Sequence, residues 1–246
     1  MKSEGNEKNL IYWDLSYRLV GDLHEVHNKV GPVPREQSHQ NAYSRWLTKQ
    51  NIAFVEKPRT KRPIFYKGRE VLALEPDFDI EGKIILELKS RREGFVPVDK
   101  TQSLNYCKLW DYRLGLLVNM GQNDVMQERL PFSPAPYHVE QDYSYIKDIM
   151  TDSLRDITEE CRQSLLTIHK EVGVGYTANI YREMLLIELA ERGLSYQAKA
   201  SITPTYDGMR LAQSPVTSVL VDNSVLVEVT ALNDKVTAAD VRVVQA

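Results

Sequence analysis

The chain has 246 residues, of which 42% are apolar, and a net charge of −3. This length exceeds the usual single domain of about 100 to 150 residues, and the apolar content is enough for two modest cores. The near-neutral charge excludes a strongly basic protein that coats nucleic acid, and without a long apolar run or leader we expect no membrane span and a cytoplasmic, intracellular protein.

The first elements along the chain are helical. After a polar start at residues 1–9, which we expect to be disordered, the pattern predicts helices at about 14–30 and 36–49. Three or four strands follow, and then a further helix. This order predicts an α+β, α/β/α-like domain in which helices flank a mixed β-sheet.

The most informative stretch is EPDFDIEGKIILELKS, residues 75–90. It has the pattern of a two-stranded hairpin that turns at Glu81–Gly82, with Asp77 on one strand and Glu87 and Lys89 on the other. Residues two apart in a strand share a face, so Glu87 and Lys89 point the same way and Asp77 can face them. Two carboxylates and an ammonium on one face are costly unless a metal ion and an anionic substrate lie between them. The pattern predicts a metal-dependent phosphodiesterase site.

Upstream of this hairpin, Gly31 and Glu36 are matched to a glycine and to the glutamate of a GxxExxY motif. His39 stands where the motif has its tyrosine, and Val33 stands in place of a second glycine. Together with the hairpin, these residues resemble the PD-(D/E)XK nuclease superfamily, and within it the GxxExxY-type proteins. The resemblance covers roughly residues 14–120.

Downstream, Gln102 and Tyr106 have the QxxxY spacing of the RecB-like exonuclease branch of that superfamily, and an apolar strand follows at 114–118. The two side chains are one helical turn apart and so share a face. The resemblance implies that they position the substrate or Lys89. Gln102 also suits an ordinary surface position, and Tyr106 suits a core position.

The chemistry of these residues suits a hard divalent ion. Asp77, Glu87 and the carbonyl of Leu88 offer oxygen ligands for Mg²⁺ or Mn²⁺, and Glu36 is the candidate third carboxylate or else a surface helix residue. Lys89 can orient or help to deprotonate the attacking water and neutralise charge on the phosphate. His39 is interpreted as a histidine that packs between helices.

Positive charge is concentrated in two runs that flank this site, KPRTKRP at 57–63 and the residues directly after Lys89. Each run is either a solvated loop or a contact for a phosphate backbone. The candidate nucleic-acid-binding residues are Lys57, Arg59, Lys61, Arg62, Arg91 and Arg92.

The same pattern occurs twice along the chain, which indicates a tandem duplication. LHEVHNKVGPVPREQSHQNAY near the start aligns with LLTIHKEVGVGYTANIYREML, and GKIILELKS aligns with NSVLVEVTA. The aligned pairs include His27 with His169, Gly31 with Gly173, and His39 with Tyr181. We therefore expect a second domain with the same helix-helix-sheet plan, beginning with helices at about 154–171 and 177–192.

The second copy lacks most of the candidate site. Ala178 aligns with Glu36, Ser218 with Asp77 and Thr230 with Lys89, while Glu228 remains at the position of Glu87 and Arg242 falls near the position of Gln102. A single carboxylate makes a poor divalent-cation site. We interpret residues 10–120 as the nuclease-like domain, 121–153 as a linker, and 154–246 as a degenerate second copy.

Two functions are consistent with these patterns. One is a Mg²⁺- or Mn²⁺-dependent nuclease that hydrolyses DNA, with RNA as the alternative substrate and the second copy as a pseudo-nuclease domain. The other is a non-catalytic nucleic-acid-binding or protein-assembly module that keeps a nuclease fold. The copies are expected to pack as an intramolecular pseudo-dimer or to pair in a homodimer. Cys107 and Cys161 have neither zinc-ligand spacing nor the pattern of a disulfide framework.

Overall fold

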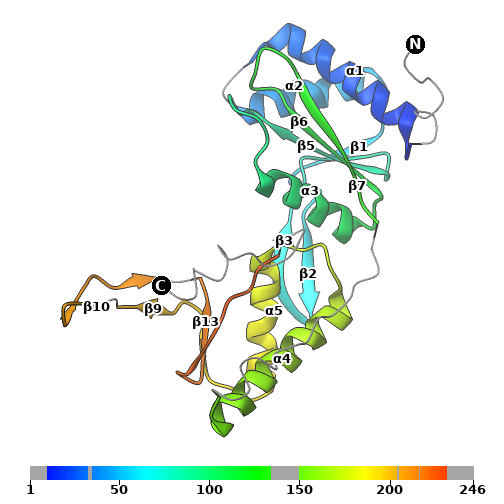
Figure 1. The fold of residues 1–246 in the computed structure, drawn as a ribbon. Helices are drawn as coiled ribbons and strands as arrows, with labels where there is room; N and C mark the ends of the chain where they lie inside the picture. Colours follow the sequence, from blue (N-terminus) through cyan, green and yellow to red (C-terminus); the bar gives the residue numbers. More distant parts are fainter. Residues whose placement is uncertain (1–9, 33–34, 134–149, 204, 216, 232–246) are drawn as a thin grey trace, which may run out of the picture. The chain divides into compact units, whose positions relative to one another are not determined.

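The computed structural model describes residues 10–32, 35–133, 150–203, 205–215 and 217–231. The chain divides into two compact units, Met1–Pro134 and Ala135–Ala246 (Figure 1). The polar start at 1–9, Val33 and Arg242 lie outside the described residues.

The first unit begins with two helices, α1 (Trp13–Val30) and α2 (Glu36–Lys49). The first and last residues of both helices agree with the predicted ranges to within one residue. Gly31 ends α1 with a φ of 75°, a backbone conformation that favours glycine, and its N–H donates to the His27 carbonyl at 2.7 Å. The short connection that follows brings α2 back over the same face of the sheet as α1.

Seven strands complete the first unit with one more helix, α3 (Pro97–Trp110), between the fifth and sixth strands. The strands are β1 (Phe54–Glu56), β2 (Arg62–Tyr66), β3 (Arg69–Leu74), β4 (Phe78–Ile80), β5 (Ile84–Lys89), β6 (Leu114–Asn119) and β7 (Met126–Pro131). Five of them form a sheet in the order β1-β4-β5-β6-β7, and β2 and β3 form a separate hairpin. β5 and β6 run parallel and their outer neighbours run antiparallel, so the sheet is mixed as predicted.

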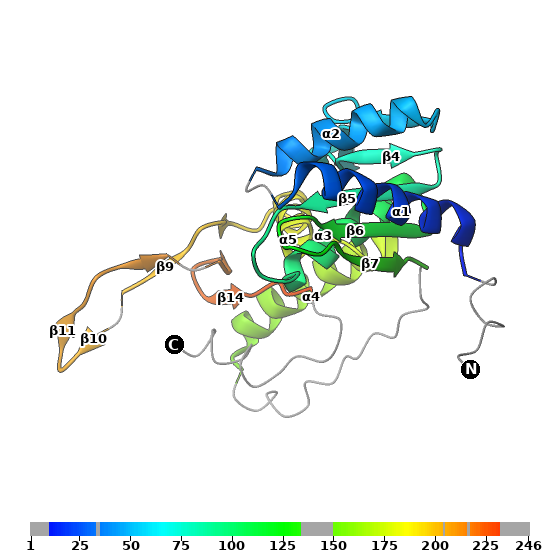
Figure 2. The ribbon, with the colours of Figure 1, turned by 90° about the horizontal axis from the view of Figure 1, so that it is seen from above.

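Helices cover both faces of this sheet (Figure 2). Leu86 and Leu88 of β5 are fully buried in the core under α1 and α2, whereas Ile85 packs with Tyr106 and Trp110 of α3. Because side chains alternate along a strand, the odd-numbered residues of β5 point toward α3. Glu87 and Lys89 therefore share the α3 face, and Leu88 points into the core as expected.

The β4–β5 hairpin turns at the residues that the sequence indicates. Glu81 and Gly82 both have positive φ, 52° and 65°, and the N–H of Lys83 donates to the Ile80 carbonyl at 3.0 Å. Two left-handed central residues are the mark of a type I′ turn, whose twist matches that of the flanking strands. This tight turn fixes the register that places Asp77 beside Glu87.

One boundary differs from the sequence interpretation. Residues 126–131, assigned to the linker, form β7, which pairs with β6 and places Pro131 opposite Leu114. The compact unit therefore reaches Pro134 and not residue 120. The sequence MQERLP shows no clear apolar alternation, because β7 is an edge strand with most of its side chains at least partly in solvent.

The second unit begins with α4 (Asp152–Val172) and α5 (Ala178–Glu191), each within two residues of the prediction. Its described strands are β8 (Tyr196–Gln197), β9 (Ser201–Ile202), β10 (Thr205–Tyr206), β11 (Met209–Arg210), β12 (Ser214–Pro215), β13 (Val219–Val221) and β14 (Val225–Val227). They include an antiparallel sheet in the order β8-β13-β14, which repeats the order β1-β4-β5 of the first unit. Residues 232–246 lie outside the described part.

Individual contacts repeat as well. His39 Nε2 lies 3.0 Å from the Gly31 carbonyl, and the Tyr181 hydroxyl donates to the Gly173 carbonyl at 2.7 Å. The residues that the alignment pairs thus make the same helix-to-helix contact in both units, and His39 packs between helices as interpreted. Cys107 and Cys161 are free and buried. In the described part of the chain, helices fall short of the length and apolar character that crossing a membrane requires.

Candidate active site

The candidate site is a row of charged residues across three neighbouring strands. In β4, Phe78 lies opposite Glu56 of β1 and opposite Leu86 of β5. One step further in the same register, Lys57 comes opposite Asp77, and Asp77 comes opposite Glu87. Backbone contacts confirm this continuation, because the Lys57 N–H donates to the Asp77 carbonyl at 3.2 Å and the Asp77 N–H donates to Glu87 Oε2 at 3.2 Å.

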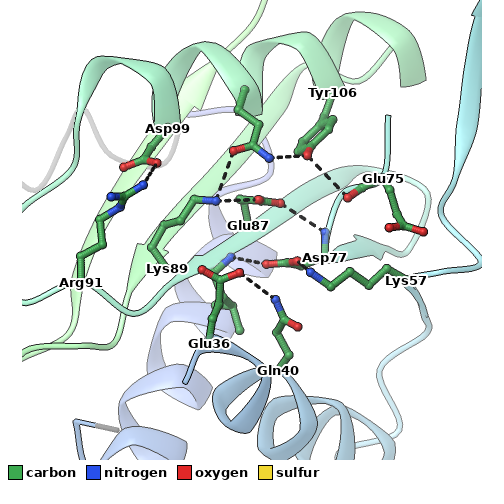
Figure 3. A network of polar contacts seen from close by, with 12 residues as sticks. Glu36, Gln40, Lys57, Glu75, Asp77, Glu87, Lys89, Arg91, Asp99 and Tyr106 are labelled. Atoms are coloured by element: carbon green, nitrogen blue, oxygen red, sulfur yellow. Dashed lines mark hydrogen bonds and ion pairs between the residues drawn. The ribbon is translucent and has the colours of Figure 1, made fainter. Parts of the chain in front are cut away.

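Each carboxylate of the row is buried and holds one lysine (Figure 3). Asp77 Oδ1 is 2.5 Å from Lys57 Nζ, and its Oδ2 accepts the Leu88 N–H at 2.9 Å. Glu87 Oε1 is 2.9 Å from Lys89 Nζ. The motif residues Asp77, Glu87 and Lys89 therefore lie together, as the hairpin pattern predicts.

Helix α3 supplies the residues that hold Lys89. Gln102 Oε1 accepts from Lys89 Nζ at 3.2 Å, and Gln102 Nε2 donates to the Tyr106 hydroxyl at 2.5 Å. Tyr106 also packs edge-on against Trp110. Burial raises the pKa of Tyr106 most, and the negative charge of Glu87 raises it further. Tyr106 is thus a core residue that also accepts a hydrogen bond from Gln102, and Gln102 in turn contacts the Lys89 ammonium.

Glu36 approaches the row from the other side, as the first residue of α2. Its Oε1 accepts from Gln40 Nε2 at 3.2 Å. Burial raises the pKa of Glu36 most, and the negative charge of Asp77 raises it further. Glu36 therefore interacts electrostatically with the row. Among the described residues, however, no three His, Cys, Asp or Glu side chains converge closely enough to hold a metal. Asp77 and Glu87 are linked directly, because the Asp77 N–H donates to Glu87 Oε2.

Burial dominates the electrostatics of the row. Removal from water, and then the charge of Asp77, raise the pKa of Glu87. Burial alone would lower the pKa of Lys89, but its attraction to Glu87 outweighs this and raises it. The net direction favours the ammonium form of Lys89, which can neutralise charge on a phosphate.

The oxygens of the row fit a hard divalent cation. The N–H and the C=O of one residue point to the same edge of a strand, and the Leu88 N–H points to Asp77. The Leu88 carbonyl therefore also points to that edge, beside the residues that directly precede β4. Carboxylate oxygens of Asp77 and Glu87 with one neutral carbonyl form the kind of ligand set that Mg²⁺ and Mn²⁺ prefer over softer sites.

The flanking basic residues differ in their surroundings. Arg62 stacks its guanidinium 4.5 Å from the Trp110 ring centre, and Arg91 pairs with Asp99 at 3.0 Å. Arg59 and Lys61 are exposed in the segment between β1 and β2. Arg92 is exposed and lines an open surface pocket of about 520 Å³ together with residues 121–124 and Pro32.

The aligned positions of the second unit carry different groups. Ala178 is the first residue of α5, as Glu36 is of α2. The Ser218 hydroxyl donates to Glu228 Oε2, and the Thr217 hydroxyl donates to Glu228 Oε1 at 3.3 Å. β14 ends before Glu228, so Thr230 lies outside the strand, whereas Lys89 lies within β5.

Two features of the site escaped the sequence interpretation. Lys57 was assigned to a basic run and not to the carboxylate row, because its place depends on the pairing of β1 with β4 across the inserted β2–β3 hairpin. Asn119 was not singled out at all. It is fully buried, and its side chain binds the N–H and the C=O of Arg91 at 2.8 and 3.0 Å. Its position at the end of an apolar strand was the available signal.

The family model of the PD-(D/E)XK nuclease superfamily matches residues 13–130 and 155–245. The two matched segments together make up most of the chain, and one falls in each compact unit. No curated protein and no solved structure matches the chain. Nucleases of this superfamily act on nucleic acids and generally use divalent metal ions. With the mixed sheet, the flanking helices and the match in both halves, this chain belongs to the PD-(D/E)XK nuclease superfamily.

Proposed function

We propose that this protein is a Mg²⁺- or Mn²⁺-dependent nuclease that hydrolyses phosphodiester bonds in DNA, and that the first unit carries the active site. The observation that supports the proposal best is the continuous chain of contacts from Asp77 through Glu87 and Lys89 to Gln102. A structural ion pair would not require a second buried carboxylate beside it. Asp77 and Glu87 are both buried, and, after burial itself, the charge of Asp77 raises the pKa of Glu87, so the two acids repel each other even with a lysine on each. A divalent cation between them would remove this repulsion.

In this proposal each residue has one role. Asp77, Glu87 and the Leu88 carbonyl hold the metal, with Glu36 as an outer carboxylate. The bound ion polarises the phosphate and lowers the pKa of a water molecule. Lys89 neutralises charge on the phosphate, and Gln102 with Tyr106 fixes the direction of its ammonium. This role of the QxxxY pair supports placement in the RecB-like, GxxExxY-type branch.

DNA contacts are proposed for the basic residues of the two runs that flank the row in the sequence. Arg59, Lys61 and Arg92 are exposed, and Lys57, Arg62 and Arg91 lie near them in the sequence with partners of their own. A phosphate backbone can exchange with such partners, and each contact contributes to a salt-dependent affinity. RNA remains the alternative substrate.

The second unit is proposed to be a pseudo-nuclease domain. Ser218 and Thr217 bind Glu228 with hydroxyl groups, so the remaining carboxylate lacks the second acid and the lysine of the first unit. Its proposed role is substrate capture, with Arg182, Arg192 and Lys199 as candidate contacts, in a pseudo-dimer or a homodimer.

The near-neutral net charge and the altered GxxExxY motif favour the second candidate function, a non-catalytic binding or assembly module.

Cleavage of labelled single- and double-stranded DNA with Mn²⁺ tests the proposal directly. Lys89→Ala removes the ammonium of the row and should lower the rate by about 100-fold or more, because a preorganised charge at the transition state contributes on this scale. Lys83→Ala is the matched control, since Lys83 directly precedes the same strand but pairs with Glu81 outside the site. Binding without metal-dependent cleavage by the unmodified chain would favour the non-catalytic module.

A further inference from the structure

Lys57 has a closer relation to the candidate site than its place in a basic run suggests. Its ammonium lies 2.5 Å from Asp77 Oδ1, and its backbone N–H donates to the Asp77 carbonyl. The residue follows β1 directly, so the β1–β4 register places its side chain on the same face as Asp77 and Glu87. This is a cross-strand pair of opposite charges, and not a loop cation that reaches the site by chance.

The positions of the two lysines leave little carboxylate oxygen uncovered. Asp77 Oδ1 binds Lys57, Asp77 Oδ2 binds the Leu88 N–H, and Glu87 Oε1 binds Lys89. Oδ1 is the Asp77 oxygen without a backbone N–H contact, so a divalent cation that binds there takes the position of the Lys57 ammonium. Close to that oxygen an ammonium and a divalent cation repel each other, and partial burial weakens the screening between them.

The two lysines are not held equally. Lys89 has a second partner in Gln102, and 10% of its side chain is exposed. Lys57 lies at the solvent edge of the row, with 31% of its side chain exposed, against 1% for Asp77. A lysine has a long flexible stem, so Lys57 can move its ammonium into water while Lys89 stays in place.

We propose that Lys57 is a built-in counter-ion that occupies the divalent-cation position on Asp77 in the metal-free protein, and that it leaves Asp77 when the cation binds. The proposal rests on the metal site of the proposed function and adds a regulation of that site. Lys57 stabilises the metal-free fold by pairing with Asp77, and it lowers the affinity for metal because the pair must first separate. Lys57 thus lowers the metal affinity of the site and stabilises its metal-free state.

The test compares Lys57→Met with Lys83→Met, which removes another ion-paired lysine, in the turn between β4 and β5. Methionine keeps most of the apolar stem and removes the charge. Mn²⁺ affinity, measured by titration calorimetry or from free Mn²⁺ by electron paramagnetic resonance, should tighten about tenfold in Lys57→Met, or about 1.4 kcal/mol. It should stay unchanged in Lys83→Met. Equal or weaker affinity in Lys57→Met overturns the proposal.

Melting temperatures give a second readout that a purely structural role would not produce. In EDTA, Lys57→Met should melt below the unmodified chain, because Asp77 and Glu87 lose a counter-ion. With saturating Mn²⁺ its melting temperature should rise by more than that of the unmodified chain, since ligand binding stabilises by mass action. A variant that is equally destabilised in EDTA and in Mn²⁺ contradicts the counter-ion role.

Lysine acetylation of the unmodified chain makes the test independent of any variant. Mn²⁺ should increase the acetylation rate of Lys57 severalfold as its ammonium leaves Asp77, and the rate at Lys83 should stay constant. If Mn²⁺ binds in an Asp77-dependent way but Lys57 does not respond, this inference is wrong and the metal site stands. If neither the unmodified chain nor Lys57→Met binds Mn²⁺, the proposed metal site fails as well.

Discussion

Replacing Asn119 by alanine should destabilise the first unit and loosen the segment that follows Lys89. Asn119 ends β6 and is fully buried. Its Oδ1 accepts from the N–H groups of Arg91 and Gly121 at 2.8 and 3.1 Å, and its Nδ2 donates to the carbonyls of Arg91 and Glu93 at 3.0 and 3.1 Å. One carboxamide thus fixes four backbone groups from two chain segments.

The size of the effect follows from those four contacts. A buried polar group left without a partner costs about 1–3 kcal/mol. Arg91 and Glu93 are exposed residues, so water can reach part of the freed backbone and reduce the cost. We therefore expect Asn119→Ala to lower the free energy of unfolding by about 2–4 kcal/mol in total, a large share of the roughly 5–15 kcal/mol of a typical domain.

The assay is urea unfolding followed by tryptophan fluorescence. All three tryptophans of the chain, Trp13, Trp46 and Trp110, lie in the first unit, so the signal reports that unit alone. Asn105→Ala is the matched control, because Asn105 is buried to a similar extent but its Oδ1 has no hydrogen-bond partner among the described residues. An equal loss of stability in the two variants would refute the reasoning, since it would assign the loss to the missing volume and not to the four contacts.

The remaining predictions concern the metal and the second unit. Asp77→Ala should abolish the rise in melting temperature that Mn²⁺ produces, whereas Glu228→Ala should leave that rise unchanged. Differential scanning calorimetry of both variants checks this. A full rise in Asp77→Ala would exclude the metal site as described. Deleting residues 154–246 should weaken DNA binding, measured by fluorescence anisotropy, much more than Mn²⁺ binding, because a single small unit offers few phosphate contacts; DNA binding as tight as that of the whole chain would exclude a capture role.

The helices and the β4–β5 hairpin could be predicted because local signals and tertiary packing agree there. Gly31 marks the end of α1, and Glu81 with Gly82 supplies the two left-handed residues of the turn. The same hairpin carries Asp77, Glu87 and Lys89, so the centre of the site followed from local pattern alone. Gln102 and Tyr106 followed from their helical spacing and from the resemblance to the family.

Non-local pairing could not be predicted. β1 pairs with β4 although the β2–β3 hairpin lies between them in the sequence, and no pattern in FVEKPRT indicates that partner. Lys57 therefore looked like one cation of a basic run. β7 was missed for a related reason, since an edge strand buries little and its sequence shows few apolar residues.

The two units show which parts of the sequence the fold needs and which it does not. The glycine that ends the first helix, the contact from the second helix to its carbonyl, and the strand order β1-β4-β5 all recur in the second unit. The charged row does not recur, because Ser218 stands at the position of Asp77, and Glu228 accepts from the hydroxyls of Ser218 and Thr217 where Glu87 pairs with Lys89. At the positions aligned with Asp77 and Glu36 the described part of the second unit carries Ser218 and Ala178, and its sheet still forms. The fold therefore does not require carboxylates at these positions. Function is the remaining explanation for keeping Asp77, Glu87 and Lys89 together.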